Sequence, residues 1–104
     1  MSAAPAYVIA NFIVNDADEY RKYEKGFFPI LKRHGGEFFT YDDSPLTFEG
    51  ADPREGRVVM FMFPSEQAAT EWYNDPDYQA LSKHRRAGTD LKFITMVHGL
   101  PPRK

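Results

Sequence analysis

The sequence predicts a single α+β domain whose elements follow the order β-α-β-β-α-β. Three observations carry this prediction. Several short runs are rich in β-branched and aromatic residues, which is typical of strands. Two longer stretches repeat apolar residues at helical spacing after a capping residue. The chain has 104 residues, which is enough for one hydrophobic core and too few for two.

The first strand and the first helix follow one another near the start of the chain. Residues 7–14 are apolar and too few for a buried helix, so we predict a strand. Asp16 begins a capping-box pattern, and apolar residues then recur at helical spacing up to His34. Because Pro29 has no N–H to donate, we expect a kink or a break near Gly26.

The middle of the chain alternates strands with turn residues. The glycine pair at 35–36 ends the helix, and a strand follows at 37–41. We expect that strand to resume at 46–49 after a turn. Residues 50–56 form a loop by their Gly, Pro and Asp content, and residues 57–63 are the clearest strand of the sequence.

The last third predicts an interrupted helix and a final strand. Ser65 is a suitable N-cap for a helix that runs through Tyr73. The Asp-Pro pair at 75–76 interrupts this helix and restarts it, because Asp favours the N-cap and Pro favours the first helical position. We expect the second part to end at Gly88 and a strand to occupy residues 91–97.

This order of elements is that of the ferredoxin-like fold, in which two helices cover one face of a four-stranded antiparallel sheet. Strands 7–14 and 57–63 are apolar on both faces, whereas a half-exposed sheet has one polar face. A second copy is therefore expected to pack sheet on sheet, which makes a homodimer through the open sheet faces. The residues expected to lack a second layer within one chain are Val8, Phe12, Met60 and Met62.

Composition and charge exclude several classes of protein. The net charge of −2 contains no basic block, so nucleic acid is not an expected partner. The chain has no cysteine, hence no disulfide framework and no thiolate metal site. No apolar run approaches the ~20 residues of a membrane helix, so we expect a cytoplasmic protein with no membrane partner. We expect a core over about residues 7–98, with loose ends at 1–6 and 100–104.

Several motifs resemble one known family. They are Tyr7-Val-Ile-Ala, Asp16-x-x-x-Tyr20-x-x-Tyr23, His34-Gly-Gly36, Val59-x-x-x-Phe63-Pro-Ser65 and, the most specific, Trp72-Tyr-Asn-Asp-Pro-Asp-Tyr-Gln79. Over about residues 7–97 the chain resembles the family catalogued as domain of unknown function 1330 (DUF1330), in the dimeric α+β barrel superfamily. The resemblance implies a ferredoxin-like protomer and a homodimeric barrel, and the family brings no established activity.

The superfamily supplies expectations about chemistry. Its members include cofactor-free quinone-forming monooxygenases, muconolactone-type isomerases and haem-handling enzymes, whose ligand usually sits between the sheet and the helices of one protomer. In the quinone-forming relatives an Asn on the sheet steadies a substrate oxygen, so Asn11 is a catalytic candidate. A buried amide that bonds only a neighbour is the other interpretation of Asn11.

The helical stretches supply further candidates. Trp72 is either a core aromatic or a donor that lines a cavity beside small alanines. Tyr78 follows six positions later, a spacing that resembles the Trp and Tyr pair of the monooxygenases. Tyr73 is a weaker ligand-binding candidate, with packing as its first interpretation. Arg85 lies on the inner face with Tyr78 and needs an anion, either a carboxylate of the chain, which we expect first, or the carboxylate or enolate of a ligand.

Histidines complete the set of candidates. His34, at a helix end where the dipole favours a cation, is also a candidate general base because its pKa lies near neutrality. His84 and His98 show no metal-ligand spacing, so we expect no protein-built metal site. A haem-type trio of Asn11, Trp72 and His84 matches only loosely, and we expect no cofactor.

Two functions of different class remain open. The first is an enzyme that acts without a cofactor on a small anionic or aromatic ligand, a phenolic or enolisable compound, in a pocket between the sheet and the helices. The second is a dimeric ligand-binding or structural protein that catalyses nothing. A cavity of ~300 Å³ or more, lined by Asn11, Trp72, Tyr78 and Arg85, distinguishes them.

Overall fold

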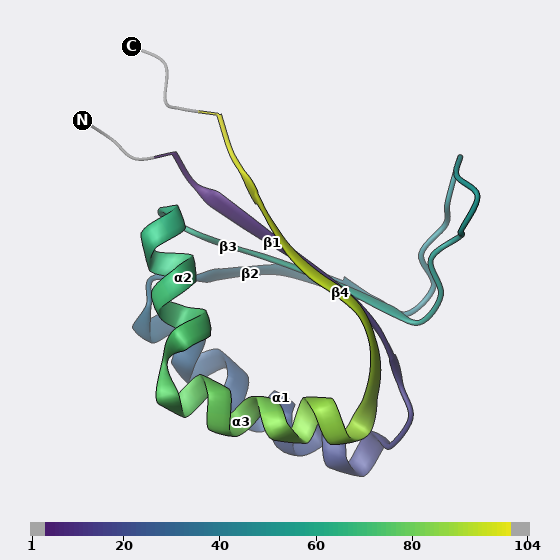
Figure 1. Ribbon diagram of the computed structural model, residues 1–104, viewed down its shortest axis with the longest axis horizontal. Helices are drawn as coiled ribbons and strands as arrows, with labels where there is room; N and C mark the ends of the chain where they lie inside the picture. The colour runs from purple at the N-terminus through teal and green to yellow at the C-terminus, as the bar shows by residue number, and fades with distance from the viewer. Residues whose placement is uncertain (1–3, 101–104) are drawn as a thin grey trace.

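The computed structural model describes residues 4–100 and contains a four-stranded antiparallel sheet with helices on one face (Figure 1). The strand order is β2-β3-β1-β4, as in the ferredoxin-like fold. The α+β prediction is therefore confirmed. In chain order, the elements are β1 (Ala6–Val14), α1 (Ala17–Arg33), β2 (Glu37–Asp42), β3 (Arg57–Phe63), α2 (Glu66–Asn74), α3 (Pro76–Gly88) and β4 (Thr89–His98).

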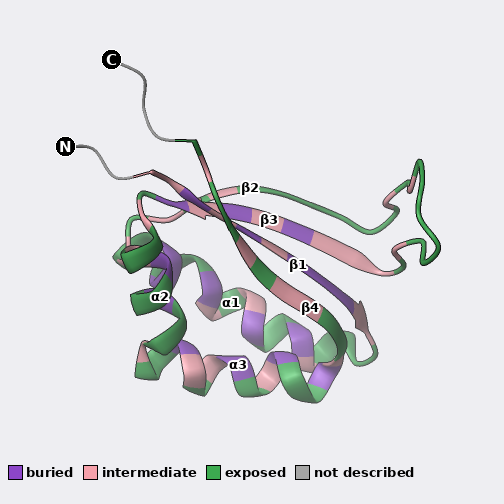
Figure 2. Cartoon of the chain, turned by 45° about the horizontal axis from the view of Figure 1, so that its top comes forward, coloured by how far each residue is buried: buried purple, intermediate pink, exposed green. Residues whose placement is uncertain are grey.

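The hydrophobic core lies between the sheet and the helices, and the buried stripes of the helices face the sheet (Figure 2). β1 contributes its even-numbered residues, and Val8 and Phe12 are almost fully buried. The register places Val8 opposite Phe61 of β3, which is buried in the same layer. The expectation that Val8 and Phe12 lack a second layer is therefore wrong, because the helices of the same chain cover them.

The opposite face of the sheet carries the residues that alternate with this core. Tyr7 pairs with Met62, and Ile9 pairs with Met60. All four side chains are partly exposed, and no helix of residues 4–100 covers this face (Figure 1). Met60 and Met62 thus lie without a second layer, as expected, on a face that we call the open face.

α1 begins at the predicted cap and runs without a break. The Asp16 side chain accepts a hydrogen bond from the Glu19 backbone N–H at 3.2 Å. The helix continues through Pro29 to Arg33, so the break expected near Gly26 does not occur. Gly26 has another role: a Cβ there would lie 2.7 Å from Leu81 of α3, so the glycine permits close packing of the two helices.

The predicted interruption of the second helical stretch is present. Ser65 caps α2 by accepting from the Ala68 N–H at 3.1 Å. Asp75 ends α2 and caps α3, since its carboxylate accepts from the Asp77 N–H at 2.8 Å. The stretch therefore forms two separate helices. Their junction at Asp75 sets how Trp72 of α2 is oriented relative to the residues of α3.

The connection between β2 and β3, residues 43–56, forms an extension that we call the arm. It reaches well beyond the ends of these strands (Figure 1). The strand predicted at residues 46–49 is absent. Leu46 and Phe48 are 78% and 90% exposed, so these apolar side chains have no sheet to pack on. Their β-favouring composition is not enough without a partner strand.

The chain ends differ in part from the expectation. β1 includes Ala6, which is fully buried, and the Gly99 N–H donates to the Pro5 carbonyl at 2.7 Å. The rest of the expected loose ends, residues 1–3 and 101–104, lies outside the described residues. Within residues 4–100, no helix is both long and apolar enough to cross a membrane.

Candidate functional site

A cavity of about 100 Å³ lies between the sheet and the helices. Its walls are mostly aromatic and aliphatic, with three charged residues among them. Its lining consists of Ala10, Phe12, Tyr20, Tyr23, Glu24, Phe27, Phe28, Phe38, Tyr41, Arg57, Val59, Phe61, Trp72, Tyr78, Arg85 and Ile94. The cavity therefore occupies the expected place in the fold, but it is smaller than the ~300 Å³ typical of ligand pockets.

Trp72 lies on the inner face of α2 and is 2% exposed. Its ring packs against Tyr78, with 4.2 Å between the ring centroids. The indole Nε1 is buried and has no hydrogen-bond partner among residues 4–100. A buried donor without a partner costs about 1–3 kcal/mol. The indole N–H of Trp72, a residue of the cavity wall, is therefore free to donate to a ligand.

Tyr78 and Tyr23 form a buried hydroxyl pair. Their oxygens are 2.9 Å apart, and Tyr78 is fully buried. Burial, reinforced by the neighbouring Tyr78, raises the pKa of Tyr23 well above its ordinary value. The Tyr23 hydroxyl therefore stays protonated near neutral pH. The hydrogen bond between the two oxygens uses one hydroxyl proton.

Arg85 lies on α3, is 2% exposed and lines the cavity. Its Nε and Nη1 have no hydrogen-bond partner within residues 4–100. The guanidinium lies 5.8 Å from the centre of the Tyr23 ring, a contact that compensates only part of a buried charge. The carboxylate partner expected within the chain is absent from the described residues, which leaves the alternative, an anionic ligand.

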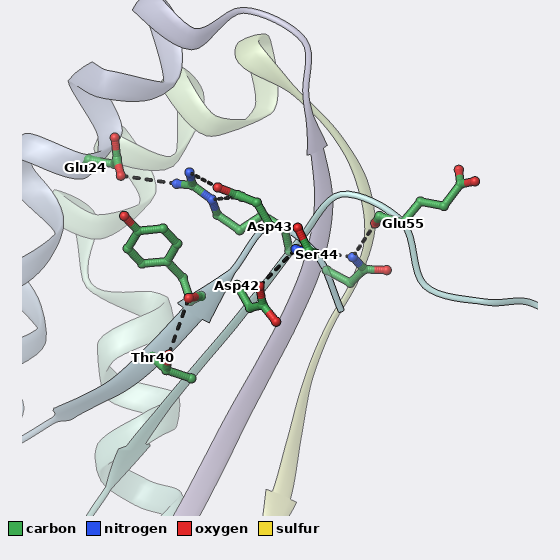
Figure 3. Close-up of polar contacts among 9 residues, drawn as sticks. Glu24, Thr40, Asp42, Asp43, Ser44 and Glu55 are labelled. Atoms are coloured by element: carbon green, nitrogen blue, oxygen red, sulfur yellow. Dashed lines mark hydrogen bonds and ion pairs between the residues drawn. The ribbon is translucent and has the colours of Figure 1, made fainter. Parts of the chain in front are cut away.

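Arg57 lines the same cavity, but carboxylates of the chain pair with its charge. Its guanidinium donates to both carboxylate oxygens of Asp43, at 2.7 and 3.1 Å, and to Glu24 at 3.3 Å. Figure 3 shows the carboxylates of Glu24 and Asp43 directed at this guanidinium. Its central carbon also stacks 4.3 Å from the Tyr41 ring. The pairing with Asp43 raises the pKa of Arg57, so this group is a structural cation.

Asn11 does not join this cavity. Its position in β1 pairs it with Val58 on the open face, and it is absent from the cavity wall. The amide Nδ2 donates to the carbonyl oxygens of Glu55 at 2.8 Å and Arg57 at 3.1 Å, which ties the arm to the sheet. The expected grouping of Asn11 with Trp72 is therefore not found, because the sheet separates them.

His34 lies at the C-terminal end of α1, outside the cavity lining. Its Nε2 is 2.7 Å from the carboxylate of Asp75, which also pairs with Arg33 at 3.0 Å. The contact with His34 is the largest cause that lowers the pKa of Asp75 to about 2. His34 thus holds the end of α1 against the junction of α2 and α3, and the structure does not place it as a base in the cavity.

Tyr73 lies outside the cavity and lines a more open groove of about 380 Å³ between α2 and β4. It is 39% exposed. Trp72 and Ile94 line both spaces, so they form the partition between the groove and the cavity. The structure therefore brings together three candidates, Trp72, Tyr78 and Arg85, and leaves Tyr73 beside them.

Sequence reasoning missed Tyr23, Glu24 and Arg57 as members of this site. Tyr23 is one of the residues that recur at helical spacing between Asp16 and His34, and a buried tyrosine needs a partner for its hydroxyl. That requirement is the signal that could have identified it. Arg57 gave no comparable signal, because its partners on α1 and the arm are distant in sequence. Residues 4–100 contain no group of three or more His, Asp or Glu side chains arranged to hold a metal ion.

Comparison with known proteins gives one family match. The model of the family described as domain of unknown function (DUF1330) matches residues 5–100. No curated protein sequence matches the chain. Among solved structures, RPA0582, a protein of unknown function from Rhodopseudomonas palustris, is similar with a TM-score of 0.72. The two are 20% identical over 97% of this chain and 85% of that chain.

Two further solved structures share the fold. SnoaB from Streptomyces nogalater, described as a cofactor-independent oxygenase, has a TM-score of 0.64 and 14% identity, covering 98% of this chain and 96% of that chain. A dimeric ferredoxin-like protein of unknown function from Thermobifida fusca YX has a TM-score of 0.54 and 14% identity, covering 92% and 90% of the two chains. Identities this low show a common fold.

Proposed function

This chain belongs to the family of domain of unknown function DUF1330, and we propose that it binds a small molecule in the cavity between its sheet and its helices. One observation carries the proposal. Arg85 is buried in the cavity wall with two nitrogens that have no partner among residues 4–100. An unbalanced buried charge costs several kcal/mol, and an anionic ligand is the group that would balance it.

The chemistry we propose is that of a cofactor-free monooxygenase or isomerase acting on an enolisable or phenolic compound. Trp72, Tyr78 and Arg85 supply hydrogen-bond donors that would stabilise an oxyanion as it forms. SnoaB, which has the same fold, is described as a cofactor-independent oxygenase and supports this class. The proposed reaction uses no metal and no organic cofactor.

The proposed site leaves out three of the initial candidates. Asn11 lies on the open face, where its amide ties down the arm. His34 is engaged with Asp75 at the helix junction. Tyr73 lines the neighbouring groove. Tyr23 replaces them, because it lines the cavity and bonds the Tyr78 hydroxyl.

The size of the cavity favours a second candidate function. Its volume of about 100 Å³ leaves little room beside the aromatic side chains in its wall. A protein that binds a small ligand without transforming it needs no further space for a co-substrate such as oxygen. A non-catalytic ligand-binding or structural protein is therefore the alternative proposal.

A homodimer is part of the proposal. The open face exposes apolar side chains of β1 and β3, and the similar protein from Thermobifida fusca is described as dimeric. A second copy packed on this face should bury at least ~800 Å² per partner. We expect Met60→Asp, which places a charge on the open face, to shift the protein to monomers. Sedimentation measures this change, and a wild-type protein that is monomeric at micromolar concentration would contradict the dimer.

Ligand binding is tested with a panel of phenolic, quinone-like and enolisable compounds. Trp72 is the chain's only tryptophan and lies in the cavity wall, so its fluorescence should change when a compound binds. A ligand at 100 times its dissociation constant should stabilise the protein by ~2.7 kcal/mol, which raises the melting temperature. Turnover of a binding compound separates the enzyme from the alternative. If no compound changes either signal, the binding proposal fails.

A further inference from the structure

Two residues of the cavity wall, Arg85 and Trp72, carry buried hydrogen-bond donors without a partner among residues 4–100. Arg85 presents Nε–H and Nη1–H, and Trp72 presents Nε1–H, all buried and without a partner among residues 4–100. The Tyr23–Tyr78 pair has two hydroxyl protons and uses one between them, so one O–H is free to donate. A ligand that satisfies these groups must bring acceptors.

The charges of the wall lead to the same ligand class. Three charged residues line the cavity: Glu24, Arg57 and Arg85. Glu24 is engaged with Arg57, which is also paired with Asp43. Arg57 is therefore balanced by carboxylates, whereas Arg85 has no carboxylate partner among residues 4–100. One negative charge on the ligand would balance Arg85. Tyr23 cannot supply that charge, since burial keeps its hydroxyl protonated.

The remaining wall limits the size and polarity of the ligand. The space of about 100 Å³ is bounded by apolar side chains such as Phe27, Phe61 and Ile94. A protein cavity of about 150 Å³ accommodates benzene, so a space of this size suits roughly four to six non-hydrogen atoms. The ligand should have a small apolar body attached to one anionic group with two acceptor atoms.

We propose that the cavity is a site for a small aliphatic monocarboxylate, held by Arg85 and Trp72 with the Tyr23–Tyr78 hydroxyl pair as a further donor. Two carboxylate oxygens offer about four lone pairs, which matches the four free donors described above. A guanidinium can bind both oxygens at once. This inference rests on the ligand binding put forward under the proposed function, not on the oxygenase or isomerase chemistry. It narrows the ligand from anionic or aromatic compounds to one class.

The test measures binding of propionate and butyrate, with propionamide and butyramide as neutral compounds of nearly equal shape. Each is titrated at constant ionic strength while Trp72 fluorescence and melting temperature are recorded. We expect both carboxylates to bind and both amides to bind at least tenfold more weakly, because an amide lacks the charge and brings a donor to a wall of donors.

Variants assign the binding to the cavity. Arg85→Met should weaken carboxylate binding at least tenfold. Its matched control is Arg86→Met, which removes the same charge from an exposed residue bonded only to Gln79 in residues 4–100, and should leave binding unchanged. Trp72→Phe keeps an aromatic ring but loses Nε1–H, and should weaken binding several-fold. Melting temperature and chemical-shift changes report on this variant, since its tryptophan fluorescence is lost.

Each result has a defined meaning. Equal binding of amides and carboxylates, or equal loss in Arg85→Met and Arg86→Met, would overturn the monocarboxylate proposal. If phenolic compounds bind and lose affinity in Trp72→Phe while propionate and butyrate do not bind, the cavity is still a ligand site and only the ligand class is wrong. If neither group of compounds binds, the proposed function itself fails.

Discussion

Arg57 and Arg85 line the same cavity, but only Arg57 has its charge balanced by carboxylates of the described chain. Arg57 lies at the edge of the cavity, where Asp43 and Glu24 are half exposed and can approach it. Arg85 is more deeply buried, at 2% exposed, and its guanidinium lies 5.8 Å from the centre of the Tyr23 ring. A paired guanidinium such as that of Arg57 stabilises the folded protein, whereas a buried guanidinium without a carboxylate partner, such as that of Arg85, destabilises it. The difference assigns Arg57 a role in the fold, and it supports the proposal that Arg85 binds a ligand.

The largest effect is expected from removal of the paired arginine. Arg57→Met loses a two-bond ion pair and the stacking on Tyr41, and the arm loses its attachment through Asp43. We expect the free energy of unfolding to fall by about 2 kcal/mol, because both carboxylate partners are partly solvated. Denaturant titration measures this change.

A matched control separates this effect from loss of charge alone. Arg21 makes one exposed ion pair with Asp18, so Arg21→Met should change the free energy of unfolding by less than about 0.5 kcal/mol. Equal effects of the two substitutions would show that Arg57 does not have the structural role assigned to it.

A smaller effect of opposite sign is expected at the unpaired arginine. Arg85→Met replaces a buried charge that has no carboxylate partner among residues 4–100 by an apolar side chain of similar length. In ligand-free protein we expect the free energy of unfolding to stay unchanged or rise by about 1–2 kcal/mol. A decrease of several kcal/mol in the same denaturant titration would mean that Arg85 is a structural partner, and the comparison between the two arginines would fail.

The smallest effect concerns pH. The Arg57 guanidinium lowers the pKa of Asp43 below its ordinary value of about 4. The folded state therefore holds the ionised carboxylate more firmly than the unfolded state. This contribution is fully present above the ordinary pKa and is lost as the pH falls through the lowered one.

Asp43→Asn tests this dependence. We expect wild type to exceed the variant by about 0.5 kcal/mol at pH 7, a small value because the Asp43 side chain is 59% exposed. The difference should shrink towards zero as the pH falls through the lowered pKa of Asp43. Denaturant titrations from pH 7 to pH 2 follow it, and a difference that stays constant across this range would exclude the ion pair as its source.

Much of the fold could be predicted because its signals are local. Asp16, Ser65 and Asp75 each cap the helix expected of them, since a capping side chain reaches a backbone N–H two or three residues away. The errors have a tertiary origin. α1 remains unbroken at Pro29, and Gly26 permits the close packing of α3. Residues 46–49 form no strand because no neighbouring strand pairs with them.

Three of the six predicted site residues, Trp72, Tyr78 and Arg85, do line the cavity. Tyr78 and Arg85 share one face of α3, since seven residues make two helical turns. Trp72 joins them because Asp75 ends one helix and begins the next. Asn11 could not be placed in the same way. A strand alternates between two faces, and alternation alone does not say which face the helices will cover.

The sequence by itself determined the order of the elements, the helix caps and the apolar character of both strand faces, because these depend on residues close together in the chain. Only the tertiary structure decided that even-numbered residues of β1 face the helices and that Tyr23 meets Tyr78. It also decided that, within the described part of the chain, carboxylates pair with Arg57 and not with Arg85. These outcomes depend on contacts between residues tens of positions apart. Which carboxylate reaches which guanidinium is set by how the helices and the arm pack on the sheet.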